Sequence, residues 1–262
     1  MPKTPITYYG GKINLVSEIL PLIPEHRVYV EPYFGGGAIF FQKPKSEAEV
    51  LNDTNAMVVN FYEVARSDFQ NLKAKIEGTL FSRASYTVAI SIYKMPHLFS
   101  KLAQAWAVYV GSNMGFSCQI GSWGYDKYNK RVKAFRNKKL IFNQDIVKRL
   151  EHVQVEHLDA LKVIVNRDGD DVMFYLDPPY PNSNQGHYSG FSEIDFENLL
   201  KVLSNIKGKF LLSSFPLEIL EKYSKKHGWY TKTFDKPLSA RKAQEGEPRG
   251  RKIEVLTANY AI

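Results

Sequence analysis

The segment FYLDPPY, residues 174–180, ends an apolar run with an aspartate, two prolines and a tyrosine. In open α/β sheets ligands bind outside the carboxyl ends of the strands, which is where Asp177 would lie. Pro178 and Pro179 fix the backbone and supply carbonyl oxygens without N–H donors of their own. The result is a stiff rim of hydrogen-bond acceptors beside the ring of Tyr180. This rim suits a planar amine that must lose hydrogens, although an aspartate capping a proline-rich turn would have the same sequence.

The exocyclic amine of a nucleobase fits this description. It is a poor nucleophile because its lone pair is delocalised into the ring, and two acceptors on its N–H bonds would localise that pair toward an electrophile. Tyr180 could stack on the base, and such stacking contributes about 1–3 kcal/mol. Stacking would offset part of the cost, roughly a few kcal/mol, of extracting a base from a duplex.

A second segment, VYVEPYFGGGAIFF, runs from a predicted strand through Glu31 and Gly35–Gly37 to a predicted helix that starts at Ala38 and continues past Gln42. Three glycines let the backbone approach a ligand closely, and the N–H groups at a helix start favour negative charge. The glycine order matches neither the GxGxxG of nicotinamide-binding loops nor the Walker A sequence. A ligand-binding loop and a simple tight turn both remain open at this point.

Two further short segments carry charged residues that could bind a ligand. Asp53 in VLNDTN lies 18 residues after Gly35, at the end of the next predicted strand, where an acid can accept both hydroxyls of a ribose. Asp53 could equally cap the next helix, since Asp, Thr and Asn all suit that position. The segment YYGGK, residues 8–12, could bring the Lys12 ammonium to a ligand carboxylate, or could be a surface turn.

Seven short apolar runs are predicted to form strands. The first five should be buried and parallel, and the last two, which flank a polar loop, should form an antiparallel pair. Strands that alternate with helices predict an α/β sheet covered on both faces. The predicted strands are Val28–Glu31, Val50–Asn52, Val153–Glu156, Val172–Leu176, Phe210–Ser213, Tyr230–Phe234 and Ile253–Ala258.

The stretch between the second and third predicted strands has a different pattern. Leu102, Trp106 and Tyr109 recur at helical spacing. We predict a helical insertion at residues 61–139 that ends in the loop-like segment NMGFSCQIGSWGYDKYNKR. Residues 1–60 and 140–262 would then form the other domain.

The chain of 262 residues is basic, with a net charge of +8 and a pI near 9.3. Seven basic residues and no acid lie between Lys127 and Lys139, with Tyr128 and Phe135 among them. Ten basic residues and three acids lie within residues 222–252. Basic clusters with interleaved aromatic rings are typical of surfaces that bind a phosphate backbone. Two solvated surface faces are the alternative explanation.

Cysteine, histidine and hydropathy patterns limit the remaining classes. Cys118 is the only cysteine, which excludes an internal disulfide and a multi-cysteine zinc site, and the six histidines show no metal-ligand spacing. No stretch approaches the roughly 20 apolar residues that span a bilayer, and the N-terminal segment lacks the apolar core of a signal peptide. We therefore expect a soluble, metal-free protein of the cytoplasm.

YYGGK, EPYFGGG, LNDTN and LDPPY occur in this order, with a helical stretch before the last. Together they resemble the Dam-type DNA adenine-N6 methyltransferases of the alpha-ordered class, in which the glycine motif precedes the target-recognition region and DPPY follows it. The resemblance extends from Tyr8 to Tyr260. It implies the class I S-adenosylmethionine-dependent methyltransferase fold, a Rossmann-like mixed seven-stranded sheet, with the helical insertion as the target-recognition region.

The resemblance also implies a reaction. S-adenosylmethionine would donate a methyl group directly to N6 of an adenine flipped out of double-stranded DNA, leaving S-adenosylhomocysteine. No metal and no covalent enzyme intermediate would take part, so that Cys118 would be chemically idle. The protein would act as a monomer at the nucleoid of a bacterium or phage-infected host, with a cognate restriction endonuclease as a candidate partner.

By position, the motifs imply roles for individual residues. Tyr8 and Lys12 would hold the methionine end of the cofactor, while Asp53 would take the ribose. Asp159, in EHLDAL, would contact the adenine of the cofactor, and the FSxxD segment at Phe191 would line the site. The full set implied for the cofactor is Tyr8, Gly11, Lys12, Glu31, Phe34, Gly35, Gly37, Asp53, Asp159 and Asp177. The catalytic set is Asp177, Pro178, Pro179 and Tyr180, and the set for DNA is Asn113, Tyr128, Lys130, Arg131, Lys133, Arg136, Arg249, Arg251 and Lys252.

Two features depart from the family pattern. The lysine motif opens with two tyrosines where the Dam group often has tryptophan and alanine. The loop NMGFSCQIGSW has no evident counterpart of the base-reading arginine of GATC-specific members, so GATC recognition is not implied. An N4-cytosine or RNA adenine methyltransferase, and a non-catalytic DNA-binding protein with the same fold, remain the alternatives.

Overall fold

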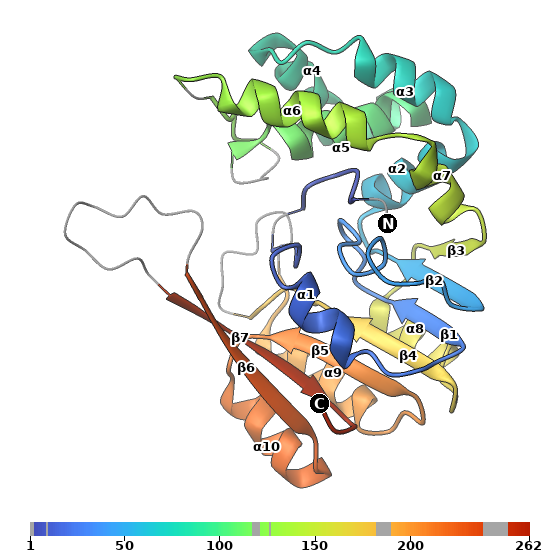
Figure 1. The fold of residues 1–262 in the computed structure, drawn as a ribbon, viewed down its shortest axis with the longest axis vertical. Helices are drawn as coiled ribbons and strands as arrows, with labels where there is room; N and C mark the ends of the chain where they lie inside the picture. The colour runs from blue at the N-terminus through green and yellow to red at the C-terminus, as the bar shows by residue number, and fades with distance from the viewer. Residues whose placement is uncertain (1–2, 9, 117–120, 126, 182–189, 238–250) are drawn as a thin grey trace, which may run out of the picture.

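The computed structural model describes residues 3–8, 10–116, 121–125, 127–181, 190–237 and 251–262, and for residues 236, 237, 251 and 252 the backbone only. Its centre is a mixed seven-stranded sheet in the order β3-β2-β1-β4-β5-β7-β6 (Figure 1). Strands β1 to β5 are parallel, and β7 runs antiparallel between β5 and β6. The strands are β1 Val28–Glu31, β2 Ala48–Asn52, β3 Val153–Glu156, β4 Val172–Leu176, β5 Lys209–Ser214, β6 Tyr230–Pro237 and β7 Arg251–Ala258.

All seven strands lie where the sequence predicts them, which confirms the mixed seven-stranded sheet. The ends differ most in the last pair, where β6 continues to Pro237 and β7 already starts at Arg251. The two strands form eight residue pairs, from Tyr230 with Ala258 to Pro237 with Arg251. Pairing along the hairpin therefore extends beyond the apolar residues that the sequence pattern detects.

Both faces of the sheet are buried by helices. Successive strand residues point to opposite faces, so neighbouring residues pack with different helices. Tyr175 and Leu211 pack with residues of the helices that lie between β2 and β3, whereas Phe174 and Leu212 pack with those of α8, α9 and α10. The predicted covering of both faces is confirmed. The helices after β3 are α8 Ala160–Asn166, α9 Glu193–Leu203 and α10 Glu218–His227.

The chain between β2 and β3 is helical, and its layer lies at the top of Figure 1, with α10 at the bottom. Helix α5 is its centre, in contact with α2, α3, α4 and α6. The helices are α2 Ala56–Ser67, α3 Phe69–Glu77, α4 Arg83–Lys94, α5 Lys101–Met114, α6 Lys130–Ile141 and α7 Gln144–Leu150, with a 3-10 turn η2 at Pro96–Leu98. Helices α2 and α6 cross the predicted boundaries at residues 61 and 139, and the division into two domains stays a prediction.

Part of the predicted recognition loop is helical. Asn113 and Met114 form the last residues of α5, and Lys130 and Arg131 open α6. The prediction of a loop was therefore wrong at both ends of the segment. Cys118 lies outside the described residues.

The prediction of a helix after the glycines is also wrong, because residues 38–42 form turns and residue 43 a bend. The N–H of Phe41 reaches the Gly37 carbonyl in helical spacing, but the N–H of Gln42 bonds only three residues back. Pro44 lies four residues after Phe40 and has no N–H that could donate to the Phe40 carbonyl. The Nη2 of Arg149, on α7, donates to that carbonyl instead, at 2.9 Å.

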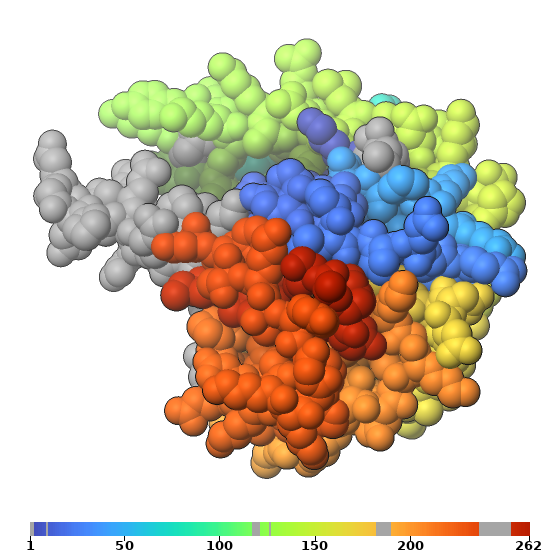
Figure 2. Space-filling view, turned by 60° about the horizontal axis from the view of Figure 1, so that its bottom comes forward, coloured from blue at the N-terminus to red at the C-terminus, as the bar shows by residue number. Residues whose placement is uncertain are grey.

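The N-terminal segment contacts the C-terminal residues that follow the last strand. Helix α1 spans Val16–Ile19 and is followed by the 3-10 turn η1 Leu20–Leu22. The Tyr260 hydroxyl donates to the Leu22 carbonyl at 2.9 Å, and Figure 2 shows the red C-terminal residues beside the blue N-terminal ones. Within the described ranges, none of the helices combines the length and the hydropathy that crossing a bilayer requires.

Candidate active site

The two central parallel strands bring two acids to one edge of the sheet. Strand β1 ends at Glu31, and β4 ends one residue before Asp177. These strands are neighbours, and the chain continues from β1 toward β2 but from β4 toward β5. This reversal is the topological switch point at which open α/β sheets bind their ligands. Asp177 thus lies at the carboxyl end of a strand, as the sequence predicts.

Asp177 forms an ion pair with Lys12 of the YYGGK segment. The Lys12 Nζ lies 2.7 Å from Asp177 Oδ1 and also donates to the Gly10 carbonyl at 2.9 Å. Burial raises the pKa of Asp177, and the charge and hydrogen bond of Lys12 act in the opposite direction. Two segments far apart in the sequence therefore form one site.

Tyr180 is anchored by its hydroxyl and is buried, with 6% of its surface exposed. The hydroxyl oxygen lies 2.8 Å from Glu254 Oε2, 2.9 Å from Ser213 Oγ and 3.3 Å from Asp177 Oδ1. The ring lies edge-on to Phe215, with ring centroids 4.4 Å apart. Sequence reasoning missed Ser213 and Glu254, although an acid inside the apolar strand pattern IEVLTA was a signal for Glu254.

The glycine loop after β1 is packed between two aromatic side chains. A Cβ on Gly35 would lie 2.9 Å from Cδ1 of Tyr8, and Gly35 has a φ of +48° that favours glycine. A Cβ on Gly37, with a φ of +64°, would lie 2.4 Å from Cζ of Phe34. Phe34 itself is buried against Tyr62, with centroids 4.7 Å apart. Glycines are thus required here to let the backbone pass beneath Tyr8 and over Phe34.

Asp53 ties this loop to the start of α2. Its Oδ2 accepts from the Gly35 N–H and its Oδ1 from the Asn55 N–H, both at 2.8 Å. Asn55, rather than Asp53, caps α2, since its side chain accepts from the Met57 N–H. Burial raises the pKa of Asp53 to about 6, although both N–H groups lower it. Each carboxylate oxygen has a second lone pair that a ligand hydroxyl can use.

Glu31 is a buried acid that is mostly protonated at neutral pH. Burial raises its pKa to about 8, and the hydrogen bond from the Tyr29 hydroxyl, at 3.0 Å, acts in the opposite direction. The nearby Asp177 raises the pKa further. The site therefore holds one neutral and one ion-paired carboxyl group side by side.

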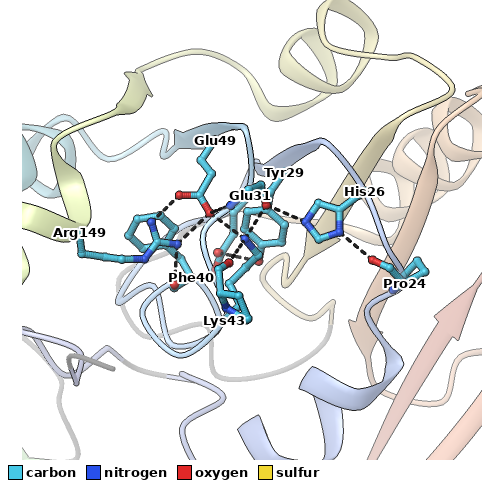
Figure 3. Close-up of polar contacts among 10 residues, drawn as sticks. Pro24, His26, Tyr29, Glu31, Phe40, Lys43, Glu49 and Arg149 are labelled. Atoms are coloured by element: carbon cyan, nitrogen blue, oxygen red, sulfur yellow. Dashed lines mark hydrogen bonds and ion pairs between the residues drawn. The ribbon is translucent and has the colours of Figure 1, made fainter.

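A buried charged network supports the residues that follow the glycine loop (Figure 3). Glu49 on β2 accepts from Lys43 Nζ at 2.7 Å and from both guanidinium Nη atoms of Arg149. The guanidinium also lies 3.5 Å from the ring centroid of Phe40, and Lys43 Nζ lies 4.3 Å from that of Tyr29. The network thus joins α7, at the end of the helical stretch, to β1, β2 and the turns that follow the glycines.

Three residues implied by the resemblance take part in helix capping. Asp159 is exposed and caps α8, with Oδ1 accepting from the N–H groups of Leu161 and Lys162. Ser192 and Asp195 of the FSxxD segment form a capping box at the start of α9. The structure therefore explains these residues locally, and their contact with a cofactor stays a prediction.

A sequence model of the D12 class N6 adenine-specific DNA methyltransferases matches residues 8–94 and 115–236 of this chain. The protein belongs to this family. The matched residues include the YYGGK segment, the glycine loop, Asp53 and Asp177. The predicted membership of a DNA adenine-N6 methyltransferase family is confirmed.

Individual methyltransferases resemble the chain over different lengths. The Type II methyltransferase M1.LlaDCHI of Lactococcus lactis subsp. cremoris is 25% identical over 276 residues, covering 96% of this chain and 93% of that protein. The Type II methyltransferase M.MjaIII of Methanocaldococcus jannaschii is 23% identical and covers 74% of each chain. The DNA N-6-adenine-methyltransferase of Escherichia phage P1 is 36% identical over 63 residues, which span 24% of this chain but only 8% of that protein.

The residues predicted from the sequence to contact DNA differ in their surroundings. Tyr128, Lys130, Lys133 and Arg136 are exposed at or near the start of α6. Arg131 is half-buried and donates to the Gly115 carbonyl at 3.1 Å. Arg249 lies outside the described residues, and Arg251 and Lys252 begin β7 with side chains that are not described.

Asn113, on α5, and Phe135, Lys138 and Lys139, on α6, are partly or fully buried. Asn113 is half-buried and bonds to the Thr7 hydroxyl at 2.9 Å, which ties α5 to the N-terminal segment. Phe135 is buried rather than interleaved with exposed charges, and Lys138 and Lys139 donate to backbone carbonyls. The cluster that the sequence shows as continuous is thus divided by the helix into an exposed side and a packed side.

Proposed function

We propose that this protein transfers a methyl group to N6 of adenine in duplex DNA, with S-adenosylmethionine along the carboxyl ends of β1, β2 and β3 and the target base at Asp177. The observation that carries the proposal is the position of the Asp177 carboxylate. It lies at the switch point of the sheet, largely buried and paired with Lys12. A carboxylate in this position can accept a hydrogen bond from an amine that enters the edge of the sheet.

The side chains at the strand ends fit S-adenosylmethionine. Carboxyl groups follow three neighbouring strands, with Glu31 at the end of β1, Asp53 after β2 and Asp159 after β3. A row of acceptors on adjacent strand ends suits the hydroxyl groups of a ribose and the amine of an adenine. A Cβ on Gly10 would meet no atom of the described residues within 4 Å, so these residues leave space beside Gly10. When bound, the cofactor supplies an electrophilic methyl group on its sulfonium.

The residues of the chain prepare the amine and receive its proton. Asp177 and the carbonyl of Pro178 accept from the two N–H bonds of N6, which localises the nitrogen lone pair for attack. Asp177 is then placed to take the proton that N6 loses after the methyl group is transferred. Burial favours this step because it raises the pKa of the Asp177 carboxyl group.

The proposal extends to the state of the DNA and to its context. We infer that the target adenine is flipped out of the duplex, since Asp177 is largely buried and cannot reach a base within a stack.

Two of the relatives are named Type II methyltransferases, which supports a companion restriction endonuclease. If so, DNA methylated by this protein will resist cleavage by an endonuclease encoded beside it.

The test is methyl transfer from labelled S-adenosylmethionine to duplex DNA, single-stranded DNA and RNA, with digestion to nucleosides. We expect N6-methyladenine in duplex DNA. Asp177→Ala should abolish transfer while binding of the duplex persists, because only the acceptor for the amine is lost. N4-methylcytosine, methylated RNA alone, or no transfer to any nucleic acid would each contradict the proposal.

A further inference from the structure

Among the described residues, three oxygen atoms lie within hydrogen-bonding reach of the Tyr180 hydroxyl, which has one proton to donate. Glu254 Oε2 lies 2.8 Å away, Ser213 Oγ 2.9 Å and Asp177 Oδ1 3.3 Å. O–H···O hydrogen bonds are usually about 2.5–3.0 Å long, and those to a carboxylate lie at the short end. The Tyr180 hydroxyl therefore donates its hydrogen bond to Glu254, and the Ser213 hydroxyl can donate to the Tyr180 oxygen. The contact with Asp177 is the long one of the three.

We propose that Glu254 is a positioning residue for methyl transfer, which holds the Tyr180 proton away from Asp177. The inference rests on the proposed role of Asp177 as the acceptor for the target amine. One oxygen of Asp177 already accepts from Lys12. If Tyr180 also donated to Asp177, the carboxylate would have less capacity left to accept from the amine and to receive its proton.

The place of Glu254 in the sheet supports this role. It lies on β7 between Ile253 and Val255, is 4% exposed, and is paired with Phe234 of β6. A buried carboxylate destabilises a fold unless hydrogen bonds compensate its lost hydration. An apolar residue would be the ordinary choice at this strand position, and the Tyr180 hydroxyl supplies a specific reason for an acid.

Glu254 also acts on Asp177 through space. Burial has the largest effect on the pKa of Asp177 and raises it, Lys12 lowers it, and the negative charge of Glu254 raises it. The Tyr180 hydroxyl, through its long 3.3 Å contact, also lowers the pKa of Asp177, but by less than the other groups named here. Replacing Glu254 by a neutral residue should therefore shift the acid limb of the pH profile for transfer to lower pH.

The test compares the turnover number, kcat, of Glu254→Ala, Glu254→Gln, Tyr180→Phe and the double variant Glu254→Ala/Tyr180→Phe. In Glu254→Ala the hydroxyl turns to Asp177, and kcat should fall about 10- to 100-fold. Gln keeps an acceptor oxygen, so Glu254→Gln should recover most of this loss while its acid limb moves to lower pH. In the double variant the misplaced hydroxyl is absent, and kcat should equal that of Tyr180→Phe within about twofold.

Thr257→Val is the matched control, because Thr257 is a buried polar residue on the same strand outside the site. It should show the kcat and pH profile of the wild type. Wild-type kcat in Glu254→Ala would overturn the inference, as would a double variant whose loss is the product of the two single losses.

A second measurement does not depend on activity. If Glu254 holds the Tyr180 hydroxyl, the losses in melting temperature of Glu254→Ala and Tyr180→Phe will not add in the double variant Glu254→Ala/Tyr180→Phe. Additive losses would overturn the inference even if the protein proved inactive. Absence of transfer by the wild type would instead overturn the proposed function and leave this contact to be decided by the melting temperatures.

Discussion

Lys12 and Asp177 lie 165 positions apart in the sequence, and their Nζ and Oδ1 atoms are 2.7 Å apart in the fold. The sequence predicted that each would face a ligand, Lys12 a carboxylate and Asp177 an amine. The structure shows that they also face each other. The ammonium of Lys12 thus occupies one oxygen of the carboxylate to which the target amine is assigned, and any change in Lys12 should be measurable as a change in Asp177.

Lys12→Gln should lower methyl transfer at pH 7 by at least about tenfold, because it removes a buried counter-charge. Lys12 lowers the pKa of Asp177, so its loss raises that pKa and a larger fraction of Asp177 is protonated at a given pH. The acid limb of the pH–rate profile should therefore shift to higher pH. Lys12→Arg keeps the charge and serves as the control. An acid limb that stays in place in Lys12→Gln would show that Lys12 does not influence the ionisation of Asp177.

Glu31 should make the protein less stable at alkaline pH. Its pKa rises from the ordinary 4.5 to about 8 on folding, so the folded state holds the proton more tightly. The stabilisation is fully present below pH 4.5 and is lost as the pH rises through about 8. It amounts to at most about 5 kcal/mol. The glutamine side chain in Glu31→Gln cannot ionise. The free energy of unfolding of this variant should therefore rise relative to that of the wild type between pH 5 and pH 9.

Urea denaturation at both pH values measures this gain. Glu47→Gln is the control, because Glu47 is exposed and its pKa is lowered by Arg27. Glu47 is therefore mainly ionised between pH 5 and pH 9 in the folded and in the unfolded protein. If Glu31→Gln and Glu47→Gln behave alike, Glu31 is ionised at neutral pH in the folded protein.

The strands could be predicted because each is an apolar run, a signal that is contained in one short segment of the sequence. The sequence 172–176, VMFYL, is buried at every position, and the pattern alone reveals it. The helix after the glycines could not be excluded in this way. Its absence depends on Pro44, which was visible, and on Arg149, which lies 109 positions from Phe40 and whose contact was not.

The site shows the same division between local and distant causes. Asp177 could be placed from its own segment, because a strand, an acid and two prolines are adjacent in the chain. Ser213 and Glu254 could not, since they lie 33 and 74 positions from Tyr180 and meet it only when β4, β5 and β7 are side by side. Asp53 was recognised as important, but its bond to Gly35 required the folded loop.

Arg149→Met should destabilise the fold far more than the loss of a surface charge. It removes a buried partner from Glu49, and breaking a buried ion pair on one side costs about 3–5 kcal/mol. Arg27→Met is the control, because it breaks a pair whose side chains are 67% and 63% exposed. Urea denaturation should show a large loss of unfolding free energy for Arg149→Met and little change for Arg27→Met. Equal losses would mean that Glu49 finds compensation from Lys43 alone.

The exposed side of α6 should contribute to DNA binding. The triple variant Lys130→Gln/Lys133→Gln/Arg136→Gln removes three exposed charges, and each phosphate contact contributes about 0.9 to the slope of log K against log salt concentration. If each side chain neutralises one phosphate, binding will weaken and the magnitude of the slope will decrease by about 2.7. The measurement is a titration of duplex DNA at several salt concentrations.

The matched control for this prediction removes the same number of charges from α10. Lys222, Lys225 and Lys226 are also exposed, but their helix lies at the opposite end of the molecule from α6 (Figure 1). A nonspecific effect of net charge would change the slope equally in both triple variants, because both lose three positive charges. A contact at α6 changes it only in the first. An unchanged slope in the α6 variant would show that these residues form a solvated face, and the DNA would then have to be held elsewhere on the protein.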